Sequence, residues 1–114
     1  MLITVFRSRL KPGLTDEYNA TEEYNAAVAR MSELVETMPG YISHKTSFAA
    51  DRERCTIVEF EHEEGLQSWR TNAKHIAAQK NARLKYYIEY SVQVCTLDRE
   101  SRFNEAEQAA KARA

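Results

Sequence analysis

The sequence predicts one α+β domain of the ferredoxin-like type, in which an antiparallel sheet carries two helices on one face. Three observations support this prediction. Strand-like runs and segments of helical period follow one another in the order βαββαβ. Pro, Gly and polar residues separate several of these segments. A chain of 114 residues with 43% hydrophobic content is too short for two hydrophobic cores.

The N-terminal part supplies a strand and a helix. Residues 2–9 are rich in β-branched and aromatic side chains and end at the turn signal Lys11-Pro12-Gly13. Thr15 is the expected helix N-cap, followed by Asp16 and Glu17 in the first turn, where carboxylates are favourable. The helix ends before Pro39 and Gly40. Its predicted buried stripe consists of Ala20, Tyr24, Ala27, Val28, Met31, Leu34, Val35 and Met38.

The remaining elements follow in the second part of the chain. Residues 41–48 and 55–61 predict two strands joined by a polar hairpin loop. Residues 66–87 predict a helical stretch, and residues 88–95 alternate apolar and polar side chains as a last strand does. The predicted domain therefore covers residues 1–103. Residues 104–114, rich in alanine, form a predicted helical or frayed tail.

The helical stretch over residues 66–87 carries the candidate site. At about 100° per residue, its apolar face contains Leu66, Trp69, Ala73, Ile76, Ala77, Leu84 and Tyr87. A polar stripe beside this face contains Ser68, Asn72, His75, Gln79, Arg83 and Tyr86. Apolar bulk bordered by a few polar groups is what a pocket for a small aromatic ligand requires. An ordinary solvent-facing helix surface would show a similar polar stripe.

One charged residue predicts an interruption of this helical stretch. Lys80 falls in the middle of the apolar face, where a charged head group is costly unless its stem reaches solvent. We therefore expect the helix to be broken between Thr71 and Lys74. Such a break would create a cleft.

Composition argues against several classes of function. Sixteen basic and 17 acidic residues give a net charge of -1, and no Lys/Arg cluster is present to follow a phosphate backbone, so we expect no nucleic-acid partner. With no long apolar run and no signal-peptide pattern, we expect no membrane partner and a cytoplasmic location. Cys55 and Cys95 lack a C-x-x-C spacing and predict reduced thiols. The spacing of His44, His62 and His75 predicts no metal site.

The central strands are apolar on both faces of the predicted sheet. Ile3, Val5 and Ile57 alternate with Leu2, Phe6, Val58 and Phe60. Because the helices cover only one face, the other face needs a cover. We expect a homodimer packed sheet to sheet.

Several short segments recur in an order and spacing typical of one protein family. They are Lys11-Pro12-Gly13, Met38-Pro39-Gly40-Tyr41-Ile42-Ser43, Ile57-Val58-Glu59-Phe60-Glu61, Glu63-Glu64-Gly65-Leu66, then Trp69, His75, Ala78-Gln79, Arg83, Tyr87 and Tyr90, and finally Val92-Gln93-Val94-Cys95. Over residues 2–103 the chain thereby resembles the antibiotic biosynthesis monooxygenase (ABM) family of dimeric α+β barrels. It departs from the family pattern at Phe60, where Trp is frequent, and at Gly65, where a better helix former is usual.

The resemblance implies a small oxygenase that acts on phenolic, quinol or polyketide-like aromatic compounds without a cofactor. Such chemistry is feasible because an ionised, electron-rich phenol can itself reduce oxygen, so the protein supplies desolvation, orientation and a base. By the resemblance, Trp69 packs against or helps to activate the substrate, and His75 is the base or hydrogen-bond partner. Helical geometry adds four expected substrate-binding residues of the pocket wall, which are Asn72, Gln79, Arg83 and Tyr86.

Two other hypotheses remain open at this point. One branch of the same family degrades haem, using an Asn on the first strand, a Trp and a His that ligates iron. This chain has Ser8 at the Asn position, where its hydroxyl is a candidate substrate-binding donor, so haem is the alternative cofactor. The third hypothesis is a ligand-binding or stress-related dimer without turnover, because one fold hosts enzymes and plain binders alike.

Overall fold

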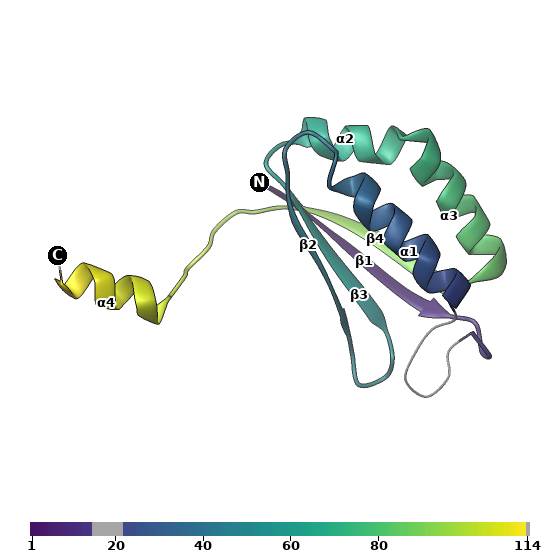
Figure 1. The fold of residues 1–114 in the computed structure, drawn as a ribbon, viewed down its shortest axis with the longest axis horizontal. Coiled ribbons are helices and arrows are strands. Elements are labelled where there is room, and N and C mark those ends of the chain that lie inside the picture. The colour runs from purple at the N-terminus through teal and green to yellow at the C-terminus, as the bar shows by residue number, and fades with distance from the viewer. Residues whose placement is uncertain (15–21, 114) are drawn as a thin grey trace.

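The structure, a computed structural model, describes residues 1–14 and 22–113 (Figure 1). Its elements are β1 (Leu2–Leu10), α1 (Glu22–Val35), β2 (Tyr41–Phe48), β3 (Arg54–Phe60), α2 (Glu63–Thr71), α3 (Ala73–Lys85), β4 (Tyr87–Thr96) and α4 (Glu105–Arg113). The expected N-cap Thr15 and the first turn with Asp16 and Glu17 lie outside the described residues.

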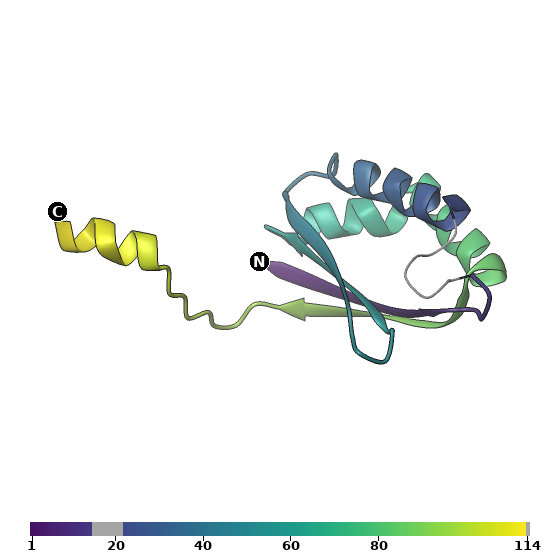
Figure 2. The same ribbon diagram turned by 60° about the horizontal axis from the view of Figure 1, so that its bottom comes forward.

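The strands form one antiparallel sheet in the order β2-β3-β1-β4, and α1, α2 and α3 lie on one face of it (Figures 1 and 2). This arrangement confirms the ferredoxin-like α+β prediction. The register places Ser8 of β1 opposite Arg54 of β3 and Tyr90 of β4. Side chains of one strand alternate between the two faces. Every second residue of each strand therefore points toward the helices.

One strand starts earlier than the sequence predicts. Arg54, which we had placed in the hairpin loop, is the first residue of β3 and pairs with Phe48 and Ser8. The turn before it is tight, with Arg52 at a positive φ of 70°. Backbone pairing on both sides draws Arg54 into the sheet despite its charge. Its side chain consequently shares the helix-covered face with Val58 and Phe60.

The hydrophobic core lies at one end of the sheet, under α2. Phe60 is fully buried, and Val35, Val58 and Leu66 are 3%, 8% and 4% exposed. The half-buried residues packed against this core are Leu2, Met38, Tyr41 and Trp69. The core is therefore small and off-centre, and the space between helices and sheet is not filled along its whole length.

The predicted helix break is confirmed. α2 ends at Thr71 and α3 begins at Ala73, with Asn72 between them in an extended conformation. The Asn72 side-chain oxygen accepts hydrogen bonds from the backbone N–H groups of Lys74 (2.9 Å) and His75 (3.2 Å). These bonds satisfy two of the unpaired donors at the start of a helix, which is the role of an N-cap.

The face that α3 presents to the sheet is not the one we expected. Ile76 and Leu84 were predicted to face the core, yet they are 38% and 78% exposed, and Lys80 is exposed between them. The break changes the direction of the chain, so α3 turns its alanine- and polar-bearing face inward. Because Lys80 faces solvent, its charge needs no compensation from the core.

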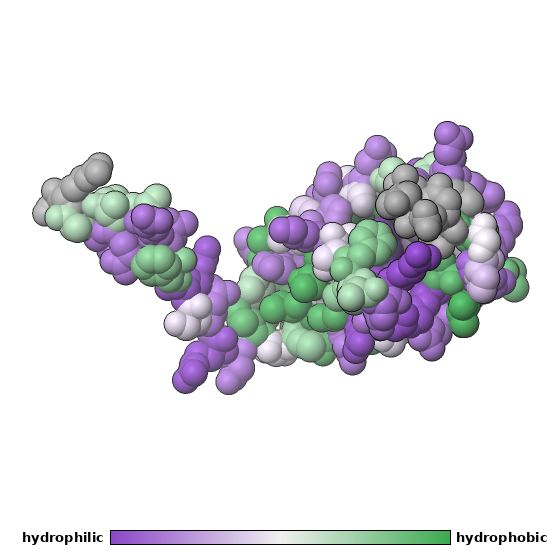
Figure 3. Space-filling model, turned by 90° about the horizontal axis from the view of Figure 1, so that it is seen from below, coloured by the Kyte–Doolittle hydropathy of each residue, from purple (hydrophilic) through white to green (hydrophobic). Residues whose placement is uncertain are grey.

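The C-terminal segment leaves the body of the molecule. After β4 the chain runs extended and then forms α4, which lies apart from the sheet and its helices (Figures 1 and 2). Phe103 is 78% exposed, and hydrophobic side chains gather on the body beside the start of this segment (Figure 3). The predicted helical tail is thus present from Glu105. The predicted domain boundary between residues 103 and 104 stays a prediction.

Gly65 has a structural reason to be glycine. A Cβ atom at this position would lie 1.9 Å from the Pro39 carbonyl oxygen and 2.8 Å from the Phe60 ring. α2 thus approaches the turn between α1 and β2, and the core, more closely than any side chain allows. This contact fixes the start of α2 on the sheet.

We predict that Gly65→Ala lowers the free energy of unfolding by about 1–3 kcal/mol, because overpacking outweighs the better helix propensity of alanine. Urea denaturation followed by circular dichroism measures this change. Gln67→Ala, an exposed change in the same helix, is the matched control and should leave stability nearly unchanged. A Gly65→Ala protein as stable as the wild type would contradict the close approach.

Candidate functional site

A cavity of about 610 Å³ lies between the sheet and the helices α1, α2 and α3. This volume is within the range of pockets that bind small organic molecules. Val92 and Val94 line it and are 46% and 49% exposed, so the cavity opens to solvent along the edge strand β4. Small side chains leave this space open, and they are Thr4, Thr46 and Thr56 on the strands and Ala27, Ala78 and Ala82 on the helices.

One stripe of α3 forms much of the helical wall. His75, Ala78, Gln79 and Ala82 line the cavity, as does Tyr86 directly after the helix. Their spacing of three and four residues places them on one helical face. Three of them, His75, Gln79 and Tyr86, belong to the polar stripe that the sequence singled out.

Trp69 and His75 form a stacked pair on the cavity wall. Their ring centroids are 3.7 Å apart and their planes are inclined by 17°. His75 Nδ1 lies 3.0 Å from the Trp69 carbonyl oxygen. A carbonyl oxygen can only accept a hydrogen bond, so Nδ1 carries the proton. In the neutral imidazole the other nitrogen, Nε2, then holds a lone pair that can take a proton.

Burial lowers the pKa of His75, and the hydrogen bond to the Trp69 carbonyl only partly opposes this effect. The imidazole is therefore neutral at pH 7. A neutral imidazole with its proton fixed on Nδ1 is in the form that a general base requires. Its orientation is also fixed, because the ring stacks on Trp69 and its backbone N–H is held by Asn72.

Tyr86 closes the other end of this wall. It is 4% exposed, and its hydroxyl donates a hydrogen bond to Glu23 (2.9 Å). Burial and the Glu23 carboxylate raise the pKa of Tyr86. The phenol is consequently neutral and adds no charge to the cavity wall.

Asn72 and Arg83, both expected in the pocket wall, are not among the described residues that line the cavity. Asn72 caps α3, as described above. The Arg83 guanidinium donates a hydrogen bond to the hydroxyl of Tyr90 and lies 5.5 Å from its ring centroid. Because Tyr90 lines the cavity, Arg83 contributes to the site only indirectly, by contacting the Tyr90 ring and hydroxyl.

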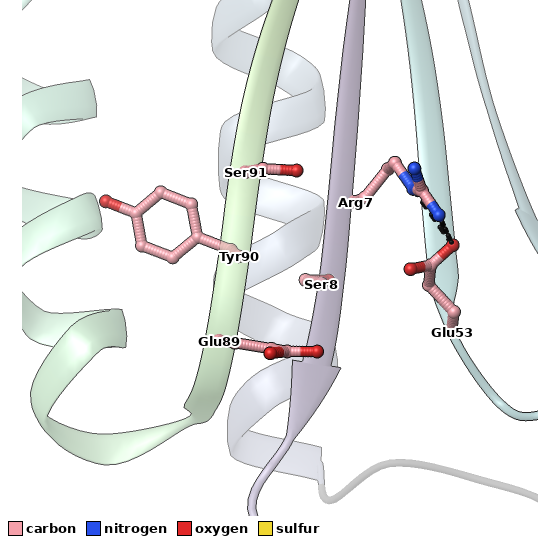
Figure 4. A pocket seen from close by; sticks show the side chains of 6 residues that line it. All are labelled: Arg7, Ser8, Glu53, Glu89, Tyr90 and Ser91. Atoms are coloured by element: carbon pink, nitrogen blue, oxygen red, sulfur yellow. Dashed lines mark hydrogen bonds and ion pairs between the residues drawn. The ribbon is translucent and has the colours of Figure 1, made fainter.

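Ser8 is not among the described residues that line the large cavity, although its strand neighbours Arg54 and Tyr90 are. It is 2% exposed, and its hydroxyl has no hydrogen-bond partner among the described residues. It lines a second, smaller pocket of about 190 Å³ (Figure 4), whose other lining residues are Arg7, Glu53, Glu89, Tyr90 and Ser91. In this view Arg7 points toward Glu53, and Tyr90 points away from Ser91.

Sequence analysis missed a cluster at the end of the cavity opposite Trp69. The guanidinium of Arg54 donates a hydrogen bond to the Tyr24 hydroxyl and lies over its ring, 5.3 Å from the centroid. The Tyr24 and Tyr87 hydroxyls are 3.0 Å apart. Burial, with a further contribution from Tyr24, raises the pKa of Tyr87. The sequence pattern that could have revealed the cluster is the alternation of Arg54, Thr56 and Val58. If β3 is extended by one residue to Arg54, these three side chains share the inner face of the sheet.

Sequence analysis assigned no role in the site to His44, yet this residue also lines the cavity. Its Nδ1 lies 2.5 Å from the Tyr41 hydroxyl. Among residues 1–14 and 22–113, no group of three or more His, Cys, Asp or Glu side chains is arranged to hold a metal ion. Cys55 and Cys95 are free thiols. In the same part of the chain no helix is long and apolar enough to cross a membrane.

No family model matches the sequence, but the sequence is similar to that of a known protein. The relative is the uncharacterized protein YqjZ of Bacillus subtilis (strain 168). It is 28% identical to this chain over 82 residues, which cover 72% of each protein.

Solved structures match the fold more widely. SnoaB, a cofactor-independent oxygenase from Streptomyces nogalater, superimposes with a TM-score of 0.67 at 13% identity, over 87% of this chain and 94% of SnoaB. An antibiotic biosynthesis monooxygenase gives a TM-score of 0.68 at 10% identity, over 85% and 98%. This chain has the ABM fold. Rv0793 from Mycobacterium tuberculosis also shares it, with a TM-score of 0.71 at 14% identity over 89% and 98%.

We predict that His75 titrates below about pH 6.5, the ordinary value for histidine. The folded protein then stays neutral at His75 while the unfolded chain takes up a proton, so this group lowers stability as the pH falls from about 6.5 to the folded pKa. NMR titration of the imidazole Cε1–H, assigned by its loss in His75→Gln, measures the midpoint. A midpoint at or above 6.5 would contradict the buried placement.

Proposed function

We propose that this chain is a cofactor-independent monooxygenase that oxidises phenolic, quinol or polyketide-like aromatic compounds in the cavity between sheet and helices. The observation that carries the proposal is the Trp69–His75 pair, which presents a neutral, oriented imidazole on the wall of an aromatic-sized cavity. The shared fold with SnoaB, itself an oxygenase without a cofactor, adds support.

The proposed reaction begins with proton transfer. His75 Nε2 accepts the phenolic proton, which leaves an electron-rich phenolate stacked near Trp69. The phenolate gives one electron to O₂, and the resulting radical pair forms a carbon–oxygen bond at a ring carbon that carries hydrogen. The O–O bond then breaks, the ring carbon loses its proton, and His75 returns its proton to the departing hydroxide.

The reaction balances without an external reductant. One oxygen atom becomes a quinone carbonyl, and the other leaves as water with the phenolic hydrogen and the ring hydrogen. The substrate supplies all electrons that reduce O₂. The protein contributes orientation, a base and, beside the pair, apolar walls from Val58 and Leu66 that reduce contact of the substrate with water.

The residues present do not fit the haem-degrading alternative. In that branch of the family the Asn of the first strand acts at the same site as the Trp and the His. Ser8, which stands at this position, does not line the cavity that Trp69 and His75 line. The position that matches the family's Asn therefore supplies no donor to this cavity, and the first-strand hydroxyl that does line it belongs to Thr4.

Oxygen uptake with a panel of quinols and polycyclic phenols tests the proposal. We predict that His75→Gln lowers the rate about 10²–10⁴-fold, the usual contribution of a general base, and leaves ligand affinity largely unchanged. His62→Gln, an exposed change outside the cavity, is the control and should retain full activity.

Three results would contradict parts of this proposal. Equal rates in wild type and His75→Gln would remove the proposed base. Ligand binding without oxygen uptake across the panel would favour a binding module without turnover. A Soret band on addition of haem that disappears in His75→Gln would instead restore the haem alternative.

We also propose that two copies associate through the sheet face opposite the helices. On this face Val5 pairs directly with Ile57, which is 41% exposed, and Ile3 lies beside them. Exposed apolar residues in the middle of a sheet favour burial against a second copy. Arg7 and Arg9, paired with Glu53 and Asp51, give one end of the face a polar rim.

We predict that Ile57→Lys converts the protein to a monomer, because an unpaired charge would be buried in the interface. Sedimentation velocity at several concentrations measures the association state. Leu84→Lys, which places the same charge on an exposed position of α3, should remain dimeric. A monomeric wild type, or an Ile57→Lys protein that is still dimeric, would contradict this interface.

A further inference from the structure

The charged side chains that line the cavity are all basic. They are Arg30, Arg54 and Arg70, and none of the described lining residues is Asp or Glu. The chain as a whole has 17 acidic and 16 basic residues, so this separation is local. A partly enclosed, low-dielectric space strengthens the field of such charges. The cavity is therefore electrostatically complementary to an anion.

Arg54 is the cation best placed to bind that anion. It is half-buried on the inner face of β3 and forms no ion pair with a carboxylate of the described residues. The adjacent Glu53 is engaged by Arg7 at 2.9 Å on the other side of the sheet. A guanidinium stays charged at all relevant pH values, so its partial burial without a carboxylate costs free energy. A bound anion would offset that cost.

The anion-binding end and the proposed base lie at opposite ends of the cavity. The Trp69 side chain packs on the core that contains Val58 and Phe60, and His75 stacks on it. Arg54 precedes Val58 by four residues along β3, which corresponds to about 13 Å of strand. The Arg54 side chain reaches part of this way, so a ligand that contacts both groups must be an elongated molecule of at least two fused rings.

We propose that the preferred substrates are aromatic acids, in which a fused-ring phenol carries a carboxylate at the end of the skeleton remote from the reacting hydroxyl. The carboxylate binds the guanidinium of Arg54, and the phenol reaches His75. Arg30 and Arg70, both exposed, attract the anion toward the opening. This inference rests on the proposed function in that it places the reacting phenol at His75.

A matched pair of ligands isolates the charge. In 6-hydroxy-2-naphthoate and 6-hydroxy-2-naphthamide the hydroxyl lies at one end and the carboxylate or the neutral amide at the other. We expect the wild type to bind the acid at least about tenfold more tightly than the amide, as measured by ligand fluorescence, because a charge-assisted bidentate bond forms only with the acid.

Substitution of Arg54 should remove this preference. In Arg54→Met the acid should bind no more tightly than the amide, and an unchanged circular dichroism spectrum should report an intact fold. Arg54→Lys should retain part of the preference, because lysine keeps the positive charge but cannot form the bidentate hydrogen bond of a guanidinium. Arg99→Met, the same change on the exposed C-terminal segment, is the control and should retain the full preference.

Equal affinity for acid and amide in the wild type would overturn the inference, as would a preference that survives Arg54→Met or the absence of binding by both ligands. The oxygenase proposal can fail separately. A preference for the acid that depends on Arg54, combined with no oxygen uptake on any phenol, would uphold the substrate class and contradict the reaction.

Discussion

The carbonyl group of Trp69 is the acceptor on which the geometry of the site depends. α2 ends at Thr71, and this carbonyl accepts hydrogen bonds from the Asn72 backbone (3.3 Å) and from His75 Nδ1 (3.0 Å). The same acceptor therefore helps to end one helix, selects the tautomer of the imidazole and holds it flat against the indole. Without the break, His75 would follow the regular helical path from Trp69, six residues away, and the two rings would not stack.

The break also decides which face of α3 meets the sheet. Because Ala78 and Ala82 face inward, the helix leaves space that larger side chains would fill, and the threonines of the sheet leave space opposite them. As a consequence, the apolar side chains of Ile76 and Leu84 remain exposed to solvent, which is unfavourable. The result is a cavity with two chemically different ends, an imidazole stacked on an indole at one and a guanidinium with tyrosines at the other.

The fold was predictable because strand and helix periods, Pro-Gly turns and chain length all indicate the same architecture. The break was predictable from Lys80, although the physical cause is different, since Asn72 ends the helix and Lys80 simply faces solvent. The inner face of α3 was predicted only in part, because helical spacing alone does not fix rotation after a break. Arg54 was missed because a charged residue beside a hairpin indicates a loop, and only its pairing with Ser8 and Phe48 shows that it points inward.

The most direct test is whether an aromatic ligand occupies the cavity beside Trp69, the only tryptophan of the chain. We would titrate the protein with emodin, a hydroxyanthraquinone, and follow tryptophan fluorescence with calorimetry in parallel. The account predicts saturable quenching that matches the calorimetric affinity, is lost in Ala82→Phe, which fills the cavity, and persists in Ala77→Phe on the exposed face. Calorimetric binding without quenching, or unchanged binding by Ala82→Phe, would show that the ligand site lies elsewhere.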